Sequence, residues 1–150
     1  MLMVLNIKSV LAGAILGVAV FMVATYAIGF TAAIAMPKGL AEWALQNSLA
    51  ALVLFLWDLV IVNLFGIGLL SFAAVFILVK FSSLNWKWIA AGFVIAETLV
   101  AYAELFLLSI RSPTPVGNLF LMLPHFLVVV ICVFAAARLA TKWKSKAEGE

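Results

Sequence analysis

The sequence predicts an all-α, polytopic transmembrane helix bundle with four crossings and with both the N-terminus and the C-terminus in the cytoplasm. Of the 150 residues, 68% are hydrophobic and only 10% are charged, and the mean hydropathy is +1.31. So little polar surface cannot cover a water-soluble globule of this size. The apolar runs are continuous rather than alternating, which favours helices over a closed barrel as the way to satisfy the backbone in lipid.

The first crossing is expected at 10–36. Lys8 precedes it, and Pro37 and Lys38 end it. It is long enough to span with tilt and about twice as long as the apolar part of a signal peptide, so we expect a retained helix. Gly13 and Gly17 form a GxxxG motif, which lets another helix backbone approach closely. Two interpretations of this motif stay open: packing within the bundle, or association with another copy or a partner subunit.

The second crossing is expected at 49–79. Positions 43–79 contain no Lys, Arg or Pro, and Asp58 is their only charge. One helix over 49–79 would be roughly 46 Å long, whereas two crossings would need roughly 40 apolar residues and a turn. We expect one long helix, loosened near Gly66 and Gly68 and preceded by an interfacial segment at 39–47, with a re-entrant or doubled segment as the alternative.

The third crossing is expected at 88–110 and the fourth at 116–140. A short polar link at 80–87 precedes the third, and Pro113 and Pro115 separate it from the fourth, because proline ends a helix. Pro124 lies within the fourth crossing, where we expect a kink. The charged tail at 141–150 completes a single domain.

The basic residues set the expected orientation, because cytoplasmic loops are enriched in Lys and Arg. In the four-crossing arrangement one side holds seven basic residues, and the other holds Lys38 and Arg111. The first group consists of Lys8, Lys80, Lys87, Arg138, Lys142, Lys144 and Lys146. We therefore expect a multi-pass protein of the plasma (inner) membrane. If the second crossing were instead two crossings, the N-terminus would be external, and the basic residues would still divide seven to two.

Three acidic residues are expected at membrane depth: Asp58, Glu97 and Glu104. A charged side chain inside a spanning helix costs a few kcal/mol, so each is a candidate functional residue. Glu97, Glu104 and Arg111 are spaced by seven and form one stripe on the third helix. Asp58 has a second interpretation, because it follows Trp57 and fits an interfacial position as well.

Counting residues from the cytoplasmic ends brings Asn63, Tyr26 and His125 within about one turn of the level of Glu104. If their faces point inward, these residues form a polar cluster with Glu104. In the functional interpretation Glu97 and Glu104 bind and release protons or a metal cation, with His125 as relay or ligand. In the structural interpretation each acid is protonated and hydrogen-bonded, or pairs with a base of another subunit.

The sequence contains none of the common catalytic motifs, neither HExxH nor GxSxG, Walker A or a Gly-rich dinucleotide loop, and we assign no catalytic residue and expect no cofactor. Cys132 is the only cysteine and His125 the only histidine, which excludes an intrachain disulfide and a two-histidine haem site. Basic residues at the ends of crossings indicate topology rather than nucleic-acid binding. The expected partners are therefore the lipid bilayer and other transmembrane helices.

Three functions are consistent with this pattern. The leading hypothesis is a small, non-enzymatic membrane subunit or accessory protein that packs in a complex or homo-oligomer and contributes buried acids to a proton or cation path. The first alternative is a small proton- or cation-coupled transporter or channel. The second is an intramembrane enzyme that acts on a lipid and assembles its site across helices.

Overall fold

The computed structural model describes residues 2–109 and 123–147, and every element within these ranges is a helix. This confirms the predicted all-α class. The elements in chain order are α1 (Leu2–Ala32), α2 (Lys38–Gln46), α3 (Ala50–Trp57), the π-helix η1 (Asp58–Gly68), α4 (Leu69–Phe81), α5 (Trp86–Ser109) and α7 (Leu123–Ala147).

Three helical runs within the described residues are long and apolar enough to cross a membrane: Asn6–Ala32, Ala50–Phe81 and Leu123–Lys146. Many large apolar side chains on them face outward, among them Ile15, which is 70% exposed, and Phe30, which is 80% exposed. Such a surface is unfavourable in water and natural in lipid, so the fold is compatible with a small membrane protein. The fourth long helix, α5, has 24 residues and carries Lys87, Glu97 and Glu104.

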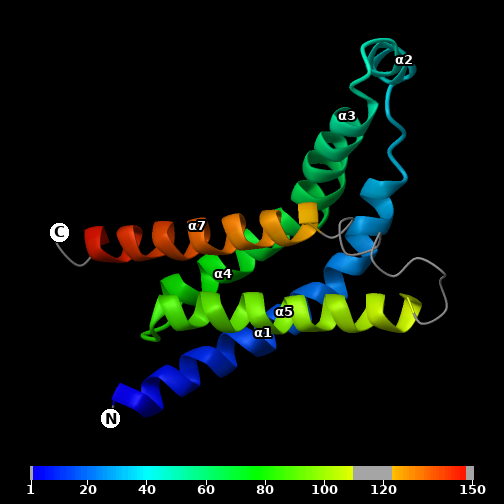
Figure 1. The fold of residues 1–150 in the computed structure, drawn as a ribbon. Coiled ribbons are helices and arrows are strands. Elements are labelled where there is room, and N and C mark those ends of the chain that lie inside the picture. Colours follow the sequence, from blue (N-terminus) through cyan, green and yellow to red (C-terminus); the bar gives the residue numbers. More distant parts are fainter. Residues whose placement is uncertain (1, 110–122, 148–150) are drawn as a thin grey trace.

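Consecutive long helices run in opposite directions (Figure 1). The start of α1, the turn between α4 and α5 and the end of α7 therefore lie at one end of the bundle. α1 packs against α5 and η1, and α7 packs against α4, η1 and α5. The last turns of α1 and the whole of α3 lead away from α5 and α7 toward α2, which lies apart at the tip.

The stretch predicted as one long helix is a single helical run from Ala50 to Phe81. Its middle third is wound as a π-helix that ends at Gly68, next to the predicted loosening. A Cβ atom on Gly66 would lie 2.9 Å from a side-chain carbon of Ile28 in α1, and one on Gly68 would lie 2.7 Å from Val128 in α7. These glycines therefore allow η1 to approach α1 and α7 closely.

The predicted interfacial segment contains the short helix α2, of which only Ala44 is buried. Its C-terminal end is closed by the Asn47 side-chain amide, which donates to the carbonyl of Trp43 at 2.8 Å. Ser48 then adopts a left-handed conformation with a φ of 55°, and this turns the chain into α3.

The GxxxG motif of α1 lies against α5 of the same chain. A Cβ atom on Gly13 would lie 2.1 Å from the carbonyl oxygen of Ile89, and one on Gly17 would lie 2.6 Å from that of Phe93. Gly92 of α5 is equally close to α1, because its Cβ would lie 2.3 Å from the carbonyl oxygen of Val10. The two backbones thus meet through three glycines, and this small-residue surface is occupied within the bundle.

Candidate functional site

Glu97 of α5 and His125 of α7 form an acid–base pair inside the bundle. The Nε2 atom of His125 lies 2.5 Å from Oε1 of Glu97, within hydrogen-bonding distance. The Glu97 side chain is fully buried, and His125 is only 8% exposed. An ionised carboxylate at such a place costs several kcal/mol unless it is paired, and the imidazole supplies the partner.

His125 belongs to α7, which the structure describes from Leu123 onward. Pro124 lies next to this boundary of the described residues, so the kink that we expect there stays a prediction. From this part of α7 the side chain of His125 reaches Glu97 on α5.

A third helix closes the site. The ring of Phe21 on α1 meets the imidazole of His125 edge to face, with centroids 6.4 Å apart and an interplanar angle of 81°. Phe21 is 8% exposed, so it excludes solvent from the imidazole on this side. The other carboxyl oxygen of Glu97, Oε2, is buried and has no hydrogen-bond partner within the described part of the chain. It is therefore an unpaired acceptor atom within the part of the chain that the structure describes.

A second carboxylate stands near the pair. The Asn63 amide donates to Oδ2 of Asp58 at 2.9 Å and to the Asp58 carbonyl at 3.0 Å. Both residues belong to η1, and i to i+5 spacing is the repeat of a π-helix, so this winding places Asn63 beside Asp58. Asn63 is 5% exposed, and Asp58 is close enough to His125 for an electrostatic interaction between the two side chains. The site thus combines groups from α5, α7 and η1.

Of the predicted polar cluster, the described residues bring Glu97 and His125 into contact. The side chain of Glu104 and the whole of Arg111 lie outside the described residues. Tyr26 does not join the cluster, because its side chain is 78% exposed while Ala24 on the inward face of α1 is fully buried.

Phe21 is a site residue that the sequence analysis missed. It had been treated as one of many apolar residues of the first crossing, although it lies four positions after Gly17, on the face that meets α5. Extending the glycine face of α1 by one more turn would have identified it.

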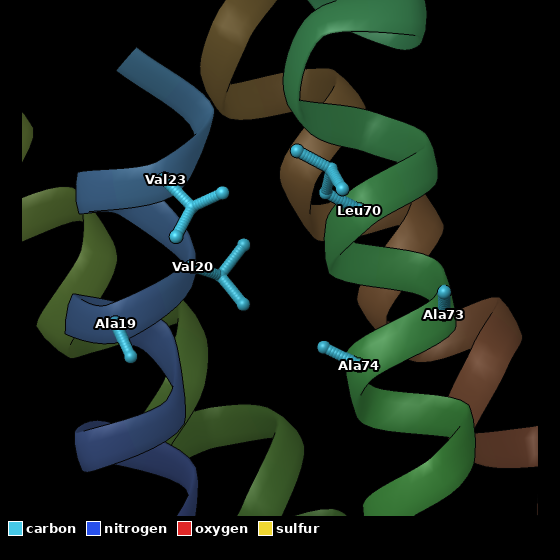
Figure 2. A pocket seen from close by; sticks show the side chains of 6 residues that line it. All are labelled: Ala19, Val20, Val23, Leu70, Ala73 and Ala74. Atoms are coloured by element: carbon cyan, nitrogen blue, oxygen red, sulfur yellow. The ribbon is translucent and has the colours of Figure 1, made fainter. Parts of the chain in front are cut away.

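Two grooves lie beside α1. The first has a volume of about 470 Å³ between α1 and α5 and shares Phe21 with the acid–base pair. Its other lining residues are Met22, Thr25, Tyr26, Val100, Ala103 and Leu107. The second, between α1 and α4, has a volume of about 310 Å³ and is lined only by apolar side chains, with Val20 and Val23 facing Leu70 and Ala74 (Figure 2). It offers no polar group for chemistry.

Among the described residues no three His, Cys, Asp or Glu side chains are grouped as a metal ion requires. One imidazole and one carboxylate in direct contact are instead suited to proton exchange, because both groups exist in two protonation states. No protein-family model, curated protein or solved structure matches this chain. The chemistry of the site is therefore argued from its geometry alone.

Proposed function

We propose that this chain is an integral membrane protein with four crossings and cytoplasmic termini, which binds and passes protons at the Glu97–His125 pair as a subunit of a homo-oligomer or complex. One observation carries the proposal. A fully buried carboxyl group contacts the only histidine of the chain, and its second oxygen has no partner among the described residues.

The pair provides a way to hold one additional proton. With one proton between them, the two groups form an ion pair or its neutral equivalent, which limits the cost of burial. A second proton taken up at Oε2 of Glu97 leaves a neutral acid beside an imidazolium. The nearby Asp58 carboxylate, held by Asn63, offsets the added positive charge. Release of that proton on the other side of the membrane would complete one transfer.

The proposed orientation, with both termini in the cytoplasm, is supported by contacts between the segments that carry most of the Lys and Arg residues. The Lys144 ammonium donates to the carbonyl of Ser82 at 3.0 Å, and the backbone N–H of Asn85 donates to the hydroxyl of Ser9 at 3.0 Å. These contacts join α1, the α4–α5 turn and α7 at one end of the bundle, where seven of the nine Lys and Arg residues lie in sequence. By the positive-inside rule this end faces the cytoplasm.

Single cysteines in a Cys132→Ala background test this topology. Ser83→Cys and Ser145→Cys should react with a membrane-impermeant maleimide only from the cytoplasmic side, and Gly39→Cys only from the other side. Labelling of position 39 from the same side as position 145 would refute the four-crossing arrangement.

Proton transfer is tested by reconstituting the purified protein into liposomes that contain a pH-sensitive dye. An imposed potential should drive proton flux in the wild type, and both Glu97→Gln and His125→Gln should abolish it. Tyr26→Phe is the matched control, because it also alters a polar side chain of a long helix but at an exposed position. Wild-type flux in Glu97→Gln would show that the pair does not carry protons.

A second candidate function is that of a packing subunit without proton transfer. It is favoured by the segment that leads away from the bundle: α3 has no buried residue, and Phe30 near the end of α1 is 80% exposed. In an assembly another chain, in place of lipid, would cover these surfaces. A stable assembly in native mass spectrometry together with no flux from the intact assembly would favour this candidate over the first.

A further inference from the structure

The last turn of α4 and the last turns of α7 form a cationic, aromatic corner at the basic end of the bundle. The Lys80 ammonium lies 5.4 Å from the ring centroid of Phe81, 5.4 Å from that of Trp143 and 5.9 Å from that of Phe76. Trp143 comes from α7, and its ring meets Phe76 edge to face at 6.5 Å. The position of Lys80 is therefore set by both helices.

A second ammonium group is held at the same corner. Lys144 follows Trp143 on α7 and donates one hydrogen bond to the Ser82 carbonyl, just after the end of α4. An ammonium has three donors, so two remain available for a further ligand. Lys80 and Lys144 are thus held at the same corner by contacts that do not neutralise their charge.

No carboxylate of the described residues pairs with either lysine, since the only salt bridge there joins Glu97 and His125. The described segments at this end, from Lys80 to Trp88 and from Arg138 to Lys146, contain no Asp or Glu. The next acids in sequence, Glu148 and Glu150, lie outside the described residues. The corner therefore carries a positive charge that an external anion would balance.

The surrounding side chains indicate the kind of anion. Phe81 is 79% exposed and Trp143 is 62% exposed, so two large aromatic groups flank the ammonium groups on the outer surface. Tryptophan at the end of a spanning helix marks the depth of lipid headgroups. Basic pockets between transmembrane helices on the cytoplasmic side bind the phosphates of anionic lipids. A free phosphate ion would use the two lysines but would have no use for the exposed rings.

We propose that Lys80, Lys144 and Trp143 form a binding site for the headgroup phosphate of an anionic phospholipid, whose glycerol and upper acyl segments lie against Trp143 and Phe81. The site rests on the membrane placement of the bundle and not on proton transfer by Glu97. It adds a specific lipid partner, held between α4 and α7, to the general contact with the bilayer.

The test is native mass spectrometry of the full chain in a neutral detergent. The probes are dioleoylphosphatidylglycerol, dioleoylphosphatidylcholine and inorganic phosphate, each titrated separately. We expect one phosphatidylglycerol to bind in preference to phosphatidylcholine. Lys80→Gln and Lys144→Gln should each weaken it about fivefold, and the double variant about 25-fold, because a basic residue near an anionic lipid contributes roughly 1 kcal/mol.

Lys142→Gln/Lys146→Gln is the matched control, since it removes two positive charges, as the test double variant does, but from two exposed positions in the last turns of α7. It should weaken phosphatidylglycerol binding less than twofold, and Lys80→Arg/Lys144→Arg should retain it. Circular dichroism and gel filtration show whether each variant is folded, and Gln at position 144 keeps a donor for the Ser82 carbonyl.

Three results would overturn the proposal: equal binding of the two lipids by the wild type, equal losses in the test and control variants, or competition by inorganic phosphate at the concentration at which the lipid binds. The last result would identify a simple anion site. None of these readouts depends on proton flux, so the lipid site and the proton site are tested separately.

Discussion

Replacing Gly13 by alanine tests the closest helix contact in the bundle. The added Cβ would lie 2.1 Å from the carbonyl oxygen of Ile89, where real contacts stay above 3.0 Å. α1 and α5 would have to separate locally by about 1 Å, and overpacking of this kind costs about 1–3 kcal/mol. We therefore expect Gly13→Ala to lower the free energy of unfolding by about that amount.

Gly29→Ala is the matched control on the same helix, because nothing lies within 4 Å of its added Cβ. Both substitutions improve intrinsic helix propensity equally, so their difference isolates the clash. Unfolding by sodium dodecyl sulfate in mixed micelles, followed by circular dichroism, measures both variants. The reasoning fails if Gly13→Ala is as stable as Gly29→Ala. It also fails if Gly13→Ala dissociates an oligomer while the monomer keeps its stability, because the motif would then serve association between chains.

Three other outcomes are expected. His125→Leu leaves the Glu97 carboxyl without its partner and should lower the free energy of unfolding by about 3–5 kcal/mol. The double variant His125→Leu/Glu97→Leu should recover most of this loss. Equal losses in the single and double variants would contradict the pairing. Phe21→Ala should speed modification of Glu97 by a hydrophobic carbodiimide, because the ring separates the α1–α5 groove from His125. Peptide mass spectrometry gives the rates. Met22→Ala, which also lines this groove but at a 65% exposed position, should leave them unchanged. Cys132 is 8% exposed, so it should react with a membrane-permeant maleimide only after unfolding, and reaction in the folded protein at the unfolded rate would show that α7 is packed differently.

The existence of the long helices follows from the apolar composition of their segments and from the prolines and charged residues between them. Continuous apolar runs must satisfy their backbone groups internally in lipid, so their helical state depends on no particular neighbour. The length argument over 49–79 likewise predicts one helical run, and the structure has one from Ala50 to Phe81. The π-helical winding of η1 has no such local cause, since it accompanies close packing of Gly66 and Gly68 against two other helices.

The candidate site was predictable only in part. A buried Glu and a lone His are visible as costly residues within apolar runs, and both were identified as candidates. Their pairing was not, because the predicted cluster placed His125 near Glu104 and included Tyr26. Tyr26 and Ala24 are two residues apart on α1, yet one is 78% exposed and the other fully buried.

By itself, then, the sequence determined that the chain is helical, that its helices are long and apolar, and which few polar residues they carry, because these properties depend on composition and on the cost of unpaired backbone groups in lipid. Only the tertiary structure decided which faces meet. A helix that is apolar on all sides carries no hydropathy signal for its rotation, whether it faces lipid or protein. The rotation of α1 is set by contacts between glycine and backbone, and that of α5 and α7 by the meeting of Glu97 with His125.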